Sequence, residues 1–378
     1  MVAVVGVVAL TACAGTQRPT TRFGDPRPAV SKGDDGGAQA DPPSAPVLHL
    51  AREDLVVERD LGGAPVRLNA TVVRPTHDGD VVKGPVFVII PGASDVSRRG
   101  LRRGDGVSTY REPVAVTTAW QDAIGHAGAH SLAYDKRTCG PNDDGECQKN
   151  PQGDLDERGP VALAADVDAA CAVAAALPGT DGRVVLLAHG QGAQVALASD
   201  CAKNAAAVVL LSPVPRGIDA VLVEALLTRA KAKAQEAKKA PPETKQAQED
   251  EAAALRNLGA SRQASFDSMR SGKFAKDARV DGATIAFWLS WIELTDKTKA
   301  MLEPVKNKAI VVVAKGDRQL GAADHALARE LPAARFVEVD ADHHLLSPPV
   351  GSAPPTLAPT TTSAVIDAVV AVIAKPSS

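Results

Sequence analysis

The sequence has few aromatic residues, no excess of basic charge and no long apolar run. Aromatic residues make up 3% of the 378 residues, which argues against a stacking platform for bases or sugars. The formal net charge is −3, whereas a general nucleic-acid binder needs a basic surface. We therefore expect no nucleic-acid partner. The apolar N-terminal run, residues 1–10, is too short to span a membrane.

Motifs for metals and phosphates are also missing. His126, His130 and His325 are scattered and share no metal-ligand spacing with carboxylates. His343 and His344 are adjacent, so we expect their side chains to diverge. No glycine-rich phosphate loop is present. We expect no cofactor and no metal.

Apolar residues make up 45% of the chain, enough for a substantial core. From residue 47 on, apolar runs of strand length alternate with helix-compatible stretches, which predicts a mostly parallel sheet flanked by helices on both faces. The expected strands are residues 55–57, 66–73, 86–90, 131–134, 184–187, 208–211, 309–314 and 336–339. The expected helices are residues 114–125, 161–177, 191–202, 322–331 and 364–374.

Residues 216–305 interrupt this alternation. The charged stretch 222–251, broken near Pro241, predicts two helical arms with solvated faces. An apolar, helix-like stretch with Trp288 and Trp291 follows. We expect this block to be a helical lid over the sheet, with the two tryptophans either lining a pocket or packing within the lid.

The N-terminus matches an export signal. Residues 10–13 read Leu-Thr-Ala-Cys, similar to the lipobox of bacterial lipoproteins, in which Cys13 is lipidated. Residues 1–13 would then be the signal peptide, although no basic residue precedes the apolar run. Residues 14–46 are rich in Gly, Pro, Asp and Ser and are typical of a flexible linker. We expect an exported protein, lipid-anchored to a membrane of the bacterial cell envelope; the alternative is an ordinary apolar N-terminal strand.

Four further cysteines are an even number, which permits disulfides in an exported protein. Cys139 and Cys147 flank a loop of Gly, Pro, Asn and Asp, so a local bridge is a possible disulfide, with buried free thiols as the alternative. Cys171 and Cys201 fall in expected helices, and whether they meet depends on the fold.

The most informative segment is residues 184–195, VVLLAHGQGAQV. It predicts a strand, a sharp turn and a helix, as in a nucleophile elbow, where small residues flank the nucleophile. Ala188 and Gly192 are the small flanks, and Gly190 takes the place of the nucleophile. Glycine has no side chain that could attack a carbonyl or hold an acyl group. The segment therefore has the frame of a serine hydrolase without its serine.

The order of the segments resembles the α/β-hydrolase family, in particular lid-bearing bacterial esterases and serine-aminopeptidase-like hydrolases. Besides the elbow, the resemblance rests on AYDKR at 133–137, VVVAKGDRQ at 311–319 and VDADHHLLSP at 339–348. It covers about residues 50–375. It implies an α/β-hydrolase core, residues 47–215 and 306–378, with the lid inserted at 216–305.

In that family the nucleophile, the acid and the histidine follow one another in the chain. The resemblance places the nucleophile at Gly190, the acid at Gln319 and the histidine at His343, with His344 as its rival. Asp317, two residues before Gln319, is a possible substitute acid. Two of the three positions would then carry the wrong side chain.

The resemblance also implies an oxyanion hole made of the backbone N–H groups of Ala93 and Gln191. Ser94 and Ser212 follow strands but lie outside the elbow, which makes each a poor replacement nucleophile. His189 is expected to pack rather than to catalyse. An arginine cluster either binds an anion or forms a solvated loop; its members are Arg98, Arg99, Arg102 and Arg103.

Two functions follow as alternatives. The first is a pseudohydrolase that binds a small carbonyl or carboxylate ligand, or a partner protein, in the lid-covered pocket. The second is an active hydrolase of ester or amide bonds, with a displaced nucleophile or with water activated by His343. The site favours the first, because fold alone does not decide function.

Overall fold

The computed structural model describes residues 48–59, 66–93, 96–102, 114–137, 139–141, 147–149, 159–275, 277–347 and 355–373. All of them lie in one compact unit, Pro46–Ser378. The expected signal peptide, Cys13 and the linker lie outside the described residues. Within the described part, no helix combines the length and the apolar character needed to cross a membrane.

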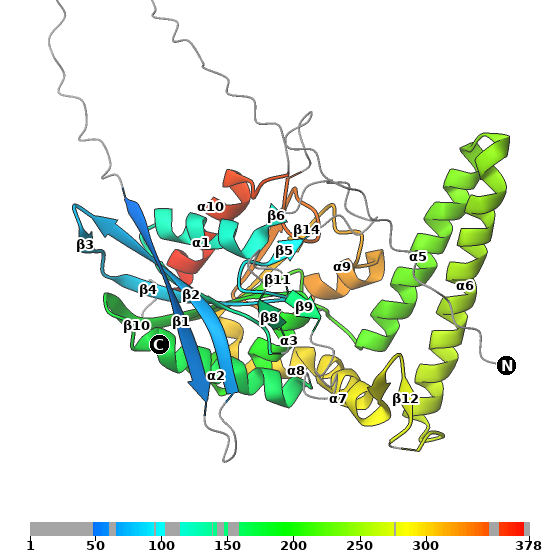
Figure 1. Ribbon diagram of the computed structural model, residues 1–378, viewed down its shortest axis with the longest axis horizontal. Coiled ribbons are helices and arrows are strands. Elements are labelled where there is room, and N and C mark those ends of the chain that lie inside the picture. Colours follow the sequence, from blue (N-terminus) through cyan, green and yellow to red (C-terminus); the bar gives the residue numbers. More distant parts are fainter. Residues whose placement is uncertain are drawn as a thin grey trace, which may run out of the picture. The chain divides into compact units, whose positions relative to one another are not determined.

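A nine-stranded sheet forms the centre of this unit, in the order β1-β2-β7-β4-β10-β11-β14-β15 with β3 beside β2 (Figure 1). The pairs that involve β2 are antiparallel, and every pair from β7 to β15 is parallel. The strands are β1 (His49–Arg59), β2 (Val66–His77), β3 (Asp80–Val81), β4 (Gly84–Ile90), β7 (His130–Tyr134), β10 (Thr180–His189), β11 (Ala207–Leu211), β14 (Ala309–Ala314) and β15 (Arg335–Val339).

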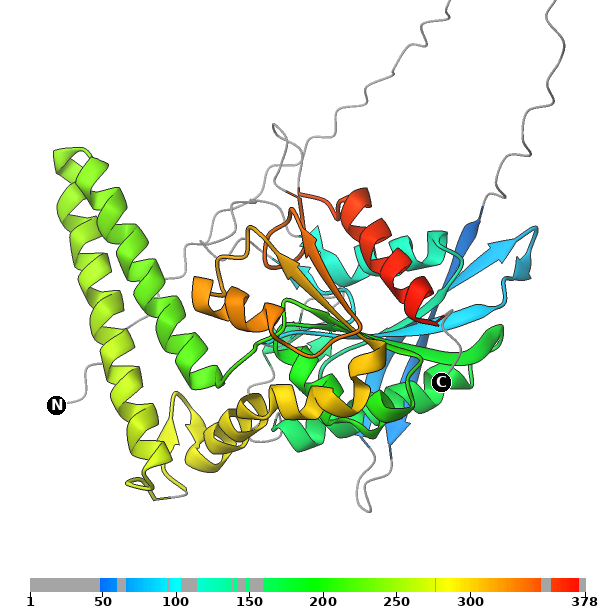
Figure 2. The same ribbon diagram turned by 180° about the vertical axis from the view of Figure 1, so that it is seen from behind.

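Helices cover both faces of the sheet (Figures 1 and 2). In β4, Val86 and Val88 belong to the core cluster on the α2 and α3 side, whereas Phe87 and Ile89 belong to the cluster on the α1 and α10 side. Successive strand residues point to opposite faces, so a strand covered on both sides is apolar throughout. The helices are α1 (Val116–His126), α2 (Pro160–Ala175), α3 (Gln191–Ala198), α4 (Asp200–Asn204), α9 (Ala322–Arg329) and α10 (Pro359–Ile373). The expected α/β-hydrolase architecture is confirmed.

A helical segment is inserted between β11 and β14. Its first two helices form a long hairpin that projects from the rest (Figures 1 and 2), and they break near Pro241 as predicted. Pro242 is the first residue of the second helix, where a backbone N–H has no acceptor within the helix, so proline loses no hydrogen bond there. The elements are α5 (Ile218–Lys239), α6 (Pro242–Arg270), β12 (Arg279–Val280), β13 (Ala283–Thr284), α7 (Ile285–Asp296), α8 (Thr298–Leu302) and a 3₁₀ turn, Glu303–Lys308.

Two helices differ from the sequence-based expectation. Residues 191–202 are not one helix, because Ser199 is extended (ψ 152°) and its hydroxyl accepts the N–H of Ala202, which caps α4. Helix α10 begins at Pro359 rather than at 364, since proline is tolerated in the first turn of a helix.

Two disulfides lie within the described residues. Cys139–Cys147 joins β8 (Cys139–Pro141) to β9 (Cys147–Lys149), the local bridge that the sequence suggested. Cys171–Cys201 joins α2 to α4, with the two Cα atoms 6.4 Å apart. This second pair meets because α4 starts anew after Ser199 and packs beside α2. The remaining short strands, β5 (Leu101–Arg102) and β6 (Val114–Ala115), pair with each other.

Candidate active site

The elbow lies where the strand order of the sheet reverses. Strand β4 has β7 on one side and β10 on the other, so the chain leaves β4 first in one direction and then in the other. In open α/β sheets, ligands bind at the carboxyl ends of the strands at such a switch point. Strand β10 ends there at His189, and α3 begins at Gln191, with Gly190 between them.

Gly190 has the backbone of a sharp elbow, with φ 53° and ψ −122°. Residues with a side chain rarely adopt this region, so glycine is the least strained residue there. A Cβ atom placed on Gly190 would meet only His343 Nε2, at 3.7 Å. A Cβ atom on Gly192 would instead lie 2.4 Å from the carbonyl oxygen of Pro91. The turn therefore requires a glycine at 192 but leaves room for a side chain at 190.

The carboxylate that holds the histidine is Asp317, which corrects the expectation that the acid position falls on Gln319. Asp317 Oδ2 lies 2.7 Å from His343 Nδ1. Asp317 Oδ1 accepts the backbone N–H groups of Gln319 at 2.8 Å and Leu320 at 3.1 Å. This local turn aims the carboxylate at the ring, and Gln319 supports it through its backbone. One triad position therefore departs from the family pattern, not two.

Asp317 is ionised at neutral pH. Its side chain is fully buried, and burial by itself would raise the pKa of the carboxyl. The neighbouring His343 and the two backbone donors outweigh that effect and lower the pKa to about 2. An ionised Asp317 holds a proton on His343 Nδ1 and leaves Nε2, which faces Gly190, as the basic nitrogen.

His343, not His344, occupies the histidine position. His344 is buried, and its ring lies 5.5 Å from the ring of His189. His189 Nε2 lies 2.8 Å from the backbone oxygen of His343, which fits an N–H donated to that carbonyl. His189 thus packs against the histidine loop, as the sequence suggested.

The expectation that His343 and His344 diverge is wrong. Their ring centres lie 5.2 Å apart, and with His189 they bring one nitrogen each to within 4.8 Å of one another. This is the one such group of possible metal ligands among the described residues. His343 Nδ1 and His189 Nε2 are hydrogen-bonded within the fold, which leaves the opposite nitrogen of each ring as its possible ligand atom.

A cavity of about 340 Å³ lies between the elbow and the inserted segment. Ala93 and Gln191, the two residues expected to form the oxyanion hole, both line it, so the fold brings them to one place. The N–H of Gln191 belongs to the first turn of α3, where backbone donors lack intrahelical acceptors. The other lining residues are Lys136, Ile218, Leu222, Arg262, Asp281, Ala283, Phe287, Trp288 and Trp291.

Sequence reasoning missed three polar residues of this cavity, Lys136, Arg262 and Asp281. Lys136 is buried, and its Nζ donates a hydrogen bond to the oxygen of Gly92 at 2.9 Å, in the turn before Ala93. Its position in AYDKR at the end of β7 was a usable signal. Arg262 lies within the charged α6, where no pattern distinguishes it from the solvated residues around it.

Other residues singled out from the sequence have structural roles. Ser212 is fully buried and its hydroxyl has no hydrogen-bond partner, so His343 does not activate it. Arg98 donates to both oxygens of Asp135, at 2.6 Å from its backbone N–H and 2.8 Å from its guanidinium, and so is bound within the fold. Ser94, Arg103 and the side chain of Arg102 lie outside the described residues.

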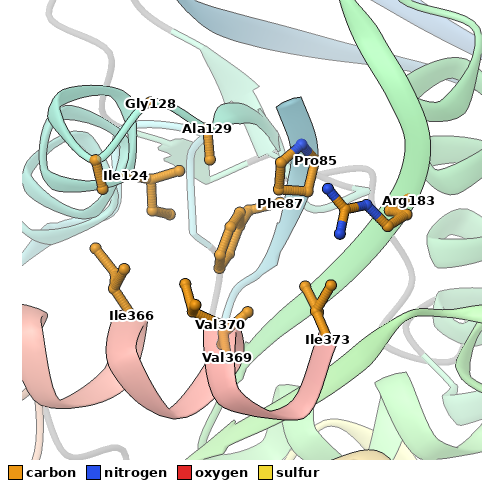
Figure 3. A pocket seen from close by; sticks show the side chains of 11 residues that line it. Pro85, Phe87, Ile124, Gly128, Ala129, Arg183, Ile366, Val369, Val370 and Ile373 are labelled. Atoms are coloured by element: carbon orange, nitrogen blue, oxygen red, sulfur yellow. The ribbon is translucent and has the colours of Figure 1, made fainter. Parts of the chain in front are cut away.

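A second cavity, of about 240 Å³, lies away from the elbow between α10, the end of α1 and the first residues of β4 (Figure 3). Its walls are apolar, with side chains such as Phe87, Ile366 and Val369 turned toward it. The one charged side chain there, Arg183, is paired with Asp181. The cavity sits at the amino ends of the strands, opposite to the edge where α/β proteins place their active sites.

Residues 87–359 match the sequence profile described as the alpha/beta hydrolase family. No curated protein sequence matches significantly.

Similar solved structures include DcsB in complex with its substrate analogue, at 15% identity and TM-score 0.48, covering 86% of this chain and 100% of that one. They also include Est1E from Butyrivibrio proteoclasticus, at 13% identity and TM-score 0.46, covering 85% and 99%. The proline iminopeptidase-related protein from Thermus thermophilus has 19% identity and TM-score 0.46, covering 85% and 99%. Likenesses at this level carry no argument about function. The family match covers most of the chain, so the protein belongs to the α/β hydrolase family.

Proposed function

We propose that this protein is a hydrolase-fold binding protein that forms no acyl-enzyme and holds a small carbonyl or carboxylate ligand in the cavity beside Gly190. One observation carries the proposal. Gly190, the residue at the elbow, has no side chain. A Cβ atom placed on it would lie 3.7 Å from Nε2, the basic nitrogen of His343. Acyl transfer needs a nucleophile that the histidine can deprotonate, and here that atom is missing.

The surroundings of the elbow favour binding of an oxygen-bearing ligand. Backbone donors do not depend on side chains, so the loss of a serine leaves the amides of Ala93 and Gln191 in place. Both residues line the same cavity, which is the size of a small-molecule site. A carbonyl or carboxylate oxygen is the natural acceptor for the amide of Gln191 in the first turn of α3.

The retained pair of Asp317 and His343 favours one alternative function, in which His343 activates a water molecule for slow hydrolysis. Without a nucleophilic side chain, serine hydrolases retain only about 10³–10⁴-fold acceleration over water. A water in the space beside Gly190 would have to take over the role of the hydroxyl.

One comparison separates the two functions. We expect the full chain and its His343→Ala variant to hydrolyse p-nitrophenyl acetate and p-nitrophenyl butyrate at the same background rate. Turnover by the native chain that disappears in His343→Ala would establish the hydrolase and overturn the binding proposal. A His325→Ala variant is the control, because His325 contacts the backbone oxygen of Asp317 but not the elbow.

We also propose that the protein is exported and lipid-anchored through Cys13. The lipobox at residues 10–13 supports this, as do two disulfides, which persist in oxidising compartments. In a bacterial host, Cys13→Ser should abolish the incorporation of labelled palmitate and move the protein from the membrane fraction to the soluble fraction. Equal labelling of both forms would rule out this anchor.

A further inference from the structure

Three histidine rings from two distant segments of the chain meet beside the elbow. The ring centre of His189 lies 4.7 Å from that of His343 and 5.5 Å from that of His344, and the last two centres are 5.2 Å apart. Imidazole rings that share a tetrahedral zinc ion, through bonds of about 2.0–2.1 Å, have centres about 5 Å apart. The spacing of these three rings, the histidine trio, therefore fits one shared metal ion.

The fold orients two of the rings in the way that metal-binding histidines are oriented. Asp317 Oδ2 lies 2.7 Å from His343 Nδ1, and the backbone oxygen of His343 lies 2.8 Å from His189 Nε2. Metal-bound histidines almost always donate their other ring N–H to a carboxylate or a backbone carbonyl, which fixes the tautomer and the direction of the ring. The nitrogens available to a metal are then His343 Nε2 and His189 Nδ1.

Both of these nitrogens lie beside a glycine. A Cβ atom on Gly190 would lie 3.7 Å from His343 Nε2, and one on Gly92 only 2.7 Å from His189 Nδ1, so a side chain at 92 would crowd that nitrogen. A cavity of about 30 Å³, close to the volume of one water molecule, is lined by Gly92, His189 and His344. The side chain of His343 is 12% exposed, which opens the trio to solvent.

Charged groups of both signs lie next to the trio. The Asp317 carboxylate is fully buried against His343, and the Asp342 carboxylate accepts the backbone N–H of His344 at 2.8 Å. The opposing charge is Lys136, whose ammonium donates to the backbone oxygen of Gly92 at 2.9 Å. Two carboxylates outweigh one ammonium, so these neighbours favour a bound cation over three protonated rings.

We propose that His189, His343 and His344 bind a zinc ion. Neutral imidazoles suit zinc, and a zinc ion with three protein ligands keeps a fourth position open for an oxygen ligand. Asp317 acts as a positioning residue for His343. The sequence-based expectation of no metal rested on spacing, which could not reveal a site whose ligands His189 and His343 lie 154 residues apart. The site goes beyond the proposed ligand binding, because it does not depend on what the larger cavity holds.

Zinc titration of the full chain, purified without a histidine tag and stripped with EDTA, tests the site. We expect one zinc ion per chain with a Kd below about 1 µM. Cobalt(II) should bind in its place and give the strong visible absorption of a tetrahedral ion, which the octahedral aqueous ion lacks. Failure to bind zinc, or an octahedral cobalt spectrum, would overturn the proposal.

Single variants test the ligands. His189→Gln, His343→Gln and His344→Gln each remove one ligand and should weaken zinc binding by at least about 100-fold, whereas Asp317→Asn should weaken it by about 10–100-fold. His126→Gln is the matched control, because His126 is exposed at the end of α1 and should not affect zinc binding. Binding that survives in all three ligand variants would place the ion elsewhere and refute this site.

Thermal unfolding keeps a failure to fold apart from the loss of a ligand. Zinc should raise the Tm of the native chain and of His126→Gln, but not that of a ligand variant that folds. His344 is buried, so the more exposed His343→Gln provides the test if His344→Gln does not fold.

A nitrogen that binds zinc cannot also accept a proton, so His343 serves either as a ligand or as a base. The ester-hydrolysis comparison of the native chain with His343→Ala is therefore made in the presence of EDTA. Its outcome then bears on the proposed function alone, and the zinc titration bears on this site alone.

Discussion

Gly190→Ser is expected to give the full chain an esterase activity at least about 100-fold above that of the native protein. The new hydroxyl would start from a Cβ position 3.7 Å from His343 Nε2, and Asp317 already holds that ring. Removing a triad serine costs about 10⁶-fold in a well-evolved hydrolase, so restoring one in an unselected elbow should recover part of that. The measurement is p-nitrophenyl butyrate hydrolysis, together with fluorophosphonate labelling mapped to position 190.

Gly190→Ala is the matched control. It imposes the same backbone strain as Gly190→Ser, because both place a Cβ atom at φ 53°, and each should lower the free energy of unfolding by about 1–3 kcal/mol. Only the serine variant should gain activity and label. If both variants fold and neither reacts, the elbow is not an intact catalytic frame. If both react equally, the nucleophile lies elsewhere.

Asp317→Asn should lower the free energy of unfolding at neutral pH by about 2 kcal/mol. The fold lowers the pKa of Asp317 from 3.8 to about 2, and each pKa unit corresponds to about 1.4 kcal/mol. Because the folded-state pKa lies below the unfolded value, the stabilising contribution of Asp317 is complete above about pH 4 and is lost as the pH falls through about 2. The deficit of the variant should therefore shrink steadily below pH 4. Urea unfolding at a series of pH values measures it.

Gln319→Ala separates the two acid positions. Gln319 reaches Asp317 through its backbone N–H, which the substitution retains, so stability and its pH dependence should change little. In the Gly190→Ser background, Asp317→Asn should return the activity to the level of the native protein, because an amide favours the wrong tautomer of the imidazole, whereas Gln319→Ala should not. Equal losses in both would restore Gln319 as the relevant residue.

Much of the fold could be predicted from local patterns. The apolar runs 86–90, 184–187, 208–211 and 309–314 all lie within observed parallel strands, because a strand buried on both faces is apolar at every position. Helix ends were harder to predict. Ser199 caps the start of α4, and Pro359 is tolerated in the first turn of α10. Both effects come from a single residue, which helix periodicity does not reveal.

The sequence by itself determined that the elbow has no nucleophile, since no arrangement of the chain supplies Gly190 with a side chain. It also determined the order of strands and helices, because periodicity and turn residues act over short distances. The tertiary structure alone decided which residues meet across long separations. It decided that Asp317, and not Gln319, contacts the ring of His343, because the turn aims the Asp317 carboxylate at that ring and leaves Gln319 to donate only its backbone N–H. It likewise decided that His343, and not His344, meets this carboxylate. It also gathered Trp291 and Arg262 on one cavity wall, which depends on packing between helices and not on any local pattern.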